Sequence, residues 1–313
     1  MQNDLHFLNP DELAGIADLS LLARRVVEGL LAGLHRSPHF GSSIEFAQYR
    51  QYVQGDDPRF VDWDLYARTD RLHTKQFHEE TNLRCSILLD ASASMSYASG
   101  KVSKLDYARM LAACLAMLLV KQNDSVGLST FQESVRLFLP PRSSSRHLQR
   151  VFVELANVEA GGQTNLVHAI QHACETLPQR SMVILISDLL DAENDMSTYI
   201  RLLRARSFDV LVLQISDPAE REFSIAKSTL LIDPENQREQ FVVPDDMREQ
   251  YLENRRAYFS AIRTACIGMQ VEMDEFDTSE PLDRALHFFL QQRQQLMSAM
   301  SGKRAGAAGG ASR

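Results

Sequence analysis

Five oxygen-bearing side chains in this sequence have the types and the order of a divalent-cation site. Asp90, Ser92 and Ser94 lie in CSILLDASASMS, directly after an apolar segment. Thr164 lies in GGQTNL, and Asp188 ends the apolar run SMVILISD. Carboxylate and hydroxyl oxygens are hard ligands, and they suit a hard cation such as Mg²⁺. The five residues therefore predict a site for Mg²⁺, with Mn²⁺ or Ca²⁺ as alternatives.

The segments around these residues are predicted to bring them to one edge of a β-sheet. From residue 83 onward, short apolar segments alternate with helical ones, which is typical of a doubly wound, mainly parallel α/β (Rossmann-type) domain. Ligands bind to such sheets at the carboxyl ends of the strands. We expect strands at 84–89, 125–130, 135–139, 182–187, 210–215 and 270–274, and helices at 103–121, 145–157, 166–176, 196–206 and 245–266.

The chain as a whole is predicted to have two parts and a tail. Residues 1–81 form an N-terminal irregular and helical subdomain, with one amphipathic helix at 19–35. Residues 82–292 form the α/β domain, in which a small hairpin is inserted at 230–243. Residues 293–313 are rich in Gly, Ala and Ser without apolar periodicity, so we expect them to be disordered.

The predicted cation site resembles the metal-ion-dependent adhesion site (MIDAS) of von Willebrand factor A domains, whose pattern is Asp-x-Ser-x-Ser, then Thr, then Asp. The resemblance implies that Ser92, Ser94 and Thr164 reach the metal through their hydroxyls. It implies that Asp90 and Asp188 act partly through bound waters. It also implies an open coordination position that accepts an acidic side chain from a partner protein.

The segment 41–80 carries a second pattern, in which aromatic residues are interleaved with charges of both signs. The residues of this pattern are Glu45, Arg50-Gln51-Tyr52, Gly55-Asp56, Arg59, Asp62-Trp63 and Ala67-Arg68. Together with the A-type region, the segment is similar to the bacterial family called domain of unknown function 58. The resemblance implies an adaptor that acts with a MoxR-type AAA+ ATPase on a client protein, in protein remodelling, complex assembly or metal insertion.

The charged and aromatic side chains of this segment have two interpretations. They form either a binding surface or the internal contacts of a small irregular subdomain, with Trp63 and Tyr66 as core anchors. We favour the internal role, because charge with interleaved aromatic residues is what such a subdomain needs.

Composition excludes several other classes of protein. A formal charge of −8 argues against a nucleic-acid partner, since such proteins usually present a basic face. The apolar stretch 110–120 is about half of the roughly 20 residues that a membrane span needs. Many relatives carry N-terminal membrane helices, and none is evident here, so we expect a cytoplasmic form without membrane insertion. The 4 cysteines form no CxxC pair, so buried, reduced thiols are expected.

The main alternative to a binding module is an enzyme. Phosphohydrolases of the haloacid-dehalogenase type also present an Asp at a strand end, but they need a second Asp where this chain has Ser92. Neither a Gly-x-Ser-x-Gly elbow nor a Walker A sequence is found. We therefore expect a binding module and not an enzyme. A phosphohydrolase that uses Asp90 is less favoured, and a structural scaffold with a vacant metal site stays open.

Overall fold

The structure, a computed structural model, forms two compact units, one of residues 1–29 and 83–313 and the other of residues 30–82. The predicted tail beyond residue 293 and the family-like stretches 41–48, 53–62 and 76–80 lie outside the described residues. Described are residue 10 and residues 18–35, 49–52, 63–75, 83–190, 196–225 and 227–293.

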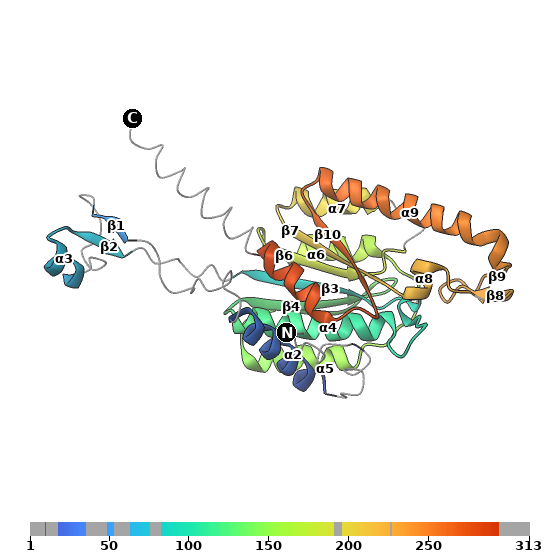
Figure 1. Cartoon of the computed structure of the whole chain (residues 1–313), viewed down its shortest axis with the longest axis horizontal. Coiled ribbons are helices and arrows are strands. Elements are labelled where there is room, and N and C mark those ends of the chain that lie inside the picture. The colour runs from blue at the N-terminus through green and yellow to red at the C-terminus, as the bar shows by residue number, and fades with distance from the viewer. Residues whose placement is uncertain are drawn as a thin grey trace, which may run out of the picture. The chain divides into compact units, whose positions relative to one another are not determined.

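A six-stranded sheet in the order β10-β7-β6-β3-β4-β5 forms the core of the larger unit (Figure 1). All neighbouring strands are parallel except β4 and β5, which are antiparallel. The prediction of a doubly wound, mainly parallel α/β sheet is therefore confirmed. The strands are β3 (Arg84–Asp90), β4 (Ser125–Phe131), β5 (Val135–Arg142), β6 (Met182–Ser187), β7 (Asp209–Ser216) and β10 (Glu272–Asp277).

Helices cover both faces of this sheet. Helices α6, α7 and α9 pack on one face in a cluster that includes Leu88 of β3, while α4 packs on the other face and α5 lies against α4 (Figure 1). Burial on both faces explains why β3 and β6 are almost entirely apolar. The helices are α2 (Leu19–His35), α4 (Lys104–Lys121), α5 (Ser145–Ala156), α6 (Leu166–Thr176), α7 (Met196–Ala205), α8 (Pro218–Glu222) and α9 (Pro244–Gly268), followed by a helix that includes residues 282–293.

The apolar stretch 110–120 lies within α4, where it is buried between the sheet and α5. No helix in the described part of the chain has the length and apolar character that a membrane span requires. The four cysteines are free and buried, as predicted.

A small hairpin, β8 (Thr229–Ile232) paired with β9 (Glu239–Val242), leaves the sheet between β7 and α9. It confirms the predicted insertion. The hairpin exposes the apolar side chains of Leu230, Leu231 and Phe241, so it contributes little to the core. Its importance lies in the loop at its tip.

The smaller unit contains a two-stranded antiparallel sheet of β1 (Tyr49–Gln51) and β2 (His73–Lys75), together with helix α3 (Trp63–Thr69). The rings of Trp63 and Tyr66 meet edge to face at 6.2 Å. Trp63 is 60% exposed and Tyr66 is also exposed. The interpretation of these two residues as core anchors is therefore wrong.

Candidate metal centre

The candidate site is built around Asp90, the last residue of β3, whose side chain is fully buried. One carboxylate oxygen, Oδ1, accepts a hydrogen bond from the backbone N–H of Ser92 at 2.9 Å. The other, Oδ2, accepts from the hydroxyl of Ser187 at 2.6 Å. Ser187 ends the neighbouring strand β6. Asp90 is therefore held by its own turn and by the adjacent strand end.

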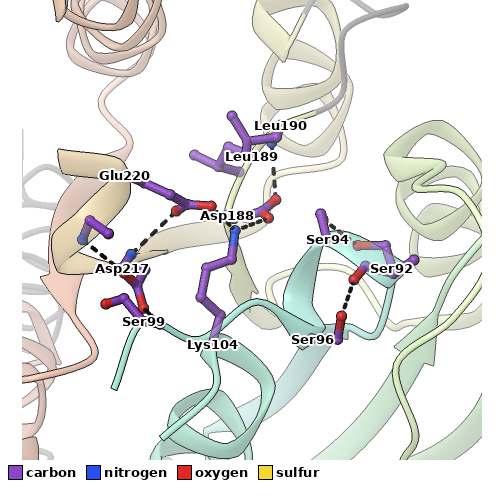
Figure 2. Close-up of polar contacts among 12 residues, drawn as sticks. Ser92, Ser94, Ser96, Ser99, Lys104, Asp188, Leu189, Leu190, Asp217 and Glu220 are labelled. Carbon is purple, nitrogen blue, oxygen red and sulfur yellow. Dashed lines mark hydrogen bonds and ion pairs between the residues drawn. The ribbon is translucent and has the colours of Figure 1, made fainter. Parts of the chain in front are cut away.

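The two predicted serine ligands follow Asp90 in a tight turn. Ser92 precedes the 3₁₀ helix η3 (Ala93–Ser96) with an extended backbone, and its side chain is fully buried. The hydroxyl oxygens of Ser92 and Ser94 lie 3.0 Å apart. Figure 2 marks this contact by a dashed line. The alternation Ser-Ala-Ser thus places two hydroxyls side by side.

Thr164 lies in the loop between α5 and α6, and this loop is hydrogen-bonded to the turn that follows β3. The N–H of Gly161 donates to the carbonyl of Ala91 at 2.9 Å, and the N–H of Ala93 donates to the carbonyl of Gly162 at 3.0 Å. Gly162 has a φ of 70°, a conformation that glycine adopts without steric cost. The structure therefore brings the Thr164 loop against the two-serine turn.

Asp188 directly follows β6 and is buried. Its Oδ1 accepts from the N–H of Leu190 at 3.1 Å, and its Oδ2 accepts from the ammonium of Lys104 at 2.8 Å. Lys104 also donates to a carboxylate oxygen of Glu220 at 2.7 Å, and Figure 2 shows it between the two acidic side chains. Both oxygens of Asp188 thus have protein partners, which is compatible with action on a metal through a bound water.

Sequence reasoning missed Lys104. The residue occupies the first turn of α4, where the positive end of the helix dipole disfavours a cation. The same helix is otherwise apolar on most of its surface. A lysine at such a position signals a buried acidic partner, and this was the available clue.

Burial and nearby negative charge raise the pKa of two carboxyl groups at the site, Asp90 and Glu220. Burial raises the pKa of Asp90 to about 7, and the negative charge of Asp188 adds to the effect. The hydrogen bonds from Ser187 and Ser92 act in the opposite direction. Burial also raises the pKa of Glu220, although Lys104 opposes this shift. A cation near Asp90 would favour its ionised form.

The donor set fits a hard cation of Mg²⁺ type. Adjacent ligands of octahedral Mg²⁺, each about 2.0–2.1 Å from the metal, lie roughly 2.9 Å from one another. The 3.0 Å between the hydroxyl oxygens of Ser92 and Ser94 matches this spacing. Among the described residues, no group of three or more His, Cys, Asp or Glu is arranged to hold a metal. Any site formed by these residues therefore depends on hydroxyl oxygens as well as carboxylates.

One contact at this site comes from the inserted hairpin. The carboxylate of Glu235, between β8 and β9, accepts hydrogen bonds from both the N–H and the hydroxyl of Thr164. A residue 71 positions away in the sequence therefore reaches one of the predicted metal ligands. No local pattern around Glu235 predicts this contact.

A pocket of about 330 Å³ adjoins Asp188, between the end of β7 and helix α9. Its walls include the aromatic side chains of Tyr251, Tyr258 and Phe259. Gln214 of β7 also lines it, and among the described residues neither amide atom of this buried side chain has a hydrogen-bond partner. The pocket therefore combines apolar walls with one side-chain amide that has no hydrogen-bond partner in the described part of the chain.

The sheet order and the polar residues at its strand ends define a von Willebrand factor A-like α/β domain. The chain belongs to the family described as "Protein of unknown function DUF58", whose family model matches residues 48–260. The family match confirms the resemblance to domain of unknown function 58, and the sheet confirms the A-type α/β architecture that the sequence predicts.

Comparison with known proteins gives relatives that are described as uncharacterized and solved structures of low sequence identity. An uncharacterized protein of Mycobacterium tuberculosis (strain H37Rv) is 27% identical over 231 residues, which cover 73% of this chain and 72% of the relative. Among solved structures, BatB from Bacteroides thetaiotaomicron is 17% identical, with a TM-score of 0.47 over 69% of this chain and 99% of BatB. The SpRpn10 VWA domain is 12% identical, with a TM-score of 0.42 over 65% of this chain and 94% of that domain.

Proposed function

We propose that this protein is a divalent-metal-dependent protein-binding module and not an enzyme. The observation that carries the proposal is a set of hydrogen bonds at one edge of the sheet. Ser187, next to Asp188, donates to Asp90, and the loop of Thr164 is bonded to the turn that holds Ser92 and Ser94. Mg²⁺ is the proposed ion, with Mn²⁺ or Ca²⁺ as alternatives.

The residues of the site would contact the ion in two different ways. The hydroxyls of Ser92, Ser94 and Thr164 would hold the ion directly, and Asp90 and Asp188 would balance its charge, partly through water. A bound ion would supply a position for a carboxylate of the partner. Lys104 fixes the orientation of Asp188 by its 2.8 Å contact, so this carboxylate needs no reorganisation when the partner binds.

We further propose that the partners are a MoxR-type AAA+ ATPase and a client protein that offers an acidic side chain. Membership of the DUF58 family supports this assignment. The ATPase would couple nucleotide hydrolysis to remodelling of the client, to complex assembly or to metal insertion. The module itself would supply recognition, because a charge-assisted carboxylate contact gives orientation as well as affinity.

A scaffold without metal is the second candidate, and one contact favours it. The ammonium of Lys104 already places a positive charge on Asp188 and Glu220. These two ion pairs do not involve Asp90, and burial still raises the pKa of that carboxyl to about 7. They therefore balance only part of the acidic charge at the site. A phosphohydrolase has less support, since the general-acid position is Ser92, whose hydroxyl lies against that of Ser94.

The proposal is tested by a pull-down between the purified full chain and a purified MoxR-type ATPase. We expect retention of the ATPase in Mg²⁺, and loss in EDTA or with Asp90→Asn. Glu249→Gln removes an exposed carboxylate on α9 and serves as the control that retains binding. Equal retention by the wild-type chain in Mg²⁺ and in EDTA would contradict a metal-dependent contact.

A further inference from the structure

The loop at the tip of the β8–β9 hairpin is shaped by its own hydrogen bonds. The side chain of Asp233 accepts from the N–H of Glu235 at 2.9 Å, and its carbonyl accepts from the N–H of Gln237 at 2.9 Å. Gln237 has a φ of 59°, which turns the chain into β9. The loop is therefore an ordered turn that holds Glu235 in a defined place.

Glu235 uses both carboxylate oxygens on one residue of the candidate metal centre. Its Oε1 accepts from the hydroxyl of Thr164 at 3.0 Å, and its Oε2 accepts from the N–H of Thr164 at 3.2 Å. The side chain is half-buried by this contact. A carboxylate of the chain itself thus lies against a hydroxyl that the proposed function assigns to the metal.

The hydrogen-bond distance between these two oxygens also fits neighbouring ligands on one ion. Adjacent oxygens around octahedral Mg²⁺ lie roughly 2.9 Å apart. The Thr164–Glu235 pair at 3.0 Å and the Ser92–Ser94 pair at 3.0 Å both match that value. Two hydrogen-bonded pairs, from three segments of chain, therefore have oxygen–oxygen distances that fit an octahedral edge.

We propose that Glu235 is an internal ligand of this metal centre and takes the coordination position otherwise open to a partner's carboxylate. The proposal rests on the metal-dependent function proposed above and adds one residue to it. Because Glu235 is tethered through the hairpin, its effective concentration at the site is of the order of millimolar or higher. A lone carboxylate in solution competes poorly with it, so only a partner with further contacts displaces it. The hairpin thereby restricts the metal site to partners whose further contacts with the protein outweigh the binding of Glu235.

The test counts the exchangeable waters on Mn²⁺ bound to the full chain, by water-proton relaxation. Glu235→Gln and Glu235→Ala are compared with Glu239→Gln, which removes an exposed carboxylate from the same hairpin. Glu235→Ala is included because a glutamine carbonyl can still bind a metal. We expect at least one Glu235 variant to gain a bound water and to bind Mn²⁺ roughly tenfold more weakly than the wild type, since ligand charge sets affinity. Glu239→Gln should match the wild type.

The possible results separate this inference from the function on which it rests. Wild-type chain that binds no Mn²⁺ overturns both proposals. Wild-type chain that binds Mn²⁺ with the same number of waters as both Glu235 variants overturns the internal ligand alone. Loss of Mn²⁺ binding in the Glu235 variants, but not in Glu239→Gln, supports the internal ligand even where waters can no longer be counted.

Discussion

The ammonium of Lys104 lies 2.8 Å from Oδ2 of Asp188, and the two side chains are 0% and 1% exposed. This pair connects the first turn of α4 to the end of β6, and Glu220 of α8 joins it from a third element. Removal of one partner from such a buried pair leaves an uncompensated charge, which costs far more than an exposed ion pair contributes.

We expect Lys104→Met to lower the free energy of unfolding by about 3–5 kcal/mol, because Asp188 and Glu220 lose their shared cation. The loss should be smaller in Mg²⁺ than in EDTA, since a bound ion replaces part of the missing charge. Urea unfolding measures both values. Lys121→Met is the control, because Lys121 pairs with Glu28 at 3.5 Å on the surface, and such pairs contribute about 0–1 kcal/mol. Equal losses in the two variants would refute a special role for Lys104.

The pH dependence of stability in EDTA should carry a contribution from Asp90. Its pKa is about 7 in the folded protein, against an ordinary value of 3.8. Between these values the folded chain retains a proton that the unfolded chain releases, so stability falls as pH rises through this window and then levels off. Asp124, whose pKa is raised to about 6 by burial, contributes with the same sign. The contribution of Asp90 is therefore the difference between the wild type and Asp90→Asn in how the free energy of unfolding changes with pH.

Urea unfolding at a series of pH values measures this difference. We expect the wild-type curve in EDTA to fall more steeply than that of Asp90→Asn between about pH 4 and pH 7. Saturating Mg²⁺ should flatten the wild-type curve, because the bound ion favours the carboxylate. Parallel curves for the two proteins in EDTA would show that Asp90 titrates near its ordinary value.

The unused amide of Gln214 should be a source of instability. A buried polar group without a partner costs about 1–3 kcal/mol, whereas an apolar group of similar shape avoids that cost. We expect Gln214→Met to raise the free energy of unfolding by about 1 kcal/mol. Gln132→Met should lower it, because the Gln132 amide donates to the carbonyls of Ala91 and Glu159. A loss of stability in both variants would mean that Gln214 is already satisfied by ordered water.

The sequence predicts the helices and strands well where local signals coincide with burial. Helix α6 spans the predicted residues, and it begins at Leu166 because the side chain of Asn165 accepts from the N–H of His168 and caps it. Strand β10 begins two residues later than predicted, at Glu272. The cause is Gln270, whose φ of 55° ends α9 in a turn before the strand can start.

The candidate site could be predicted only in part. Asp90 and Asp188 end apolar strands, so their types and positions identify them. Lys104, Ser187 and Glu235 reach the site from other elements, and only the folded chain shows which carboxylate or hydroxyl each one meets. Contacts of this kind depend on tertiary structure and leave little trace in the local sequence.

The most direct test of a metal-dependent module is the stability of the full chain as Mg²⁺ is added. At 100 times its dissociation constant, an ion that binds only the folded state raises the free energy of unfolding by about 2.7 kcal/mol. We expect that rise for the wild type and for Glu249→Gln, and none for Asp90→Asn. A free energy of unfolding for the wild type that does not change with Mg²⁺, Mn²⁺ or Ca²⁺ would contradict the account.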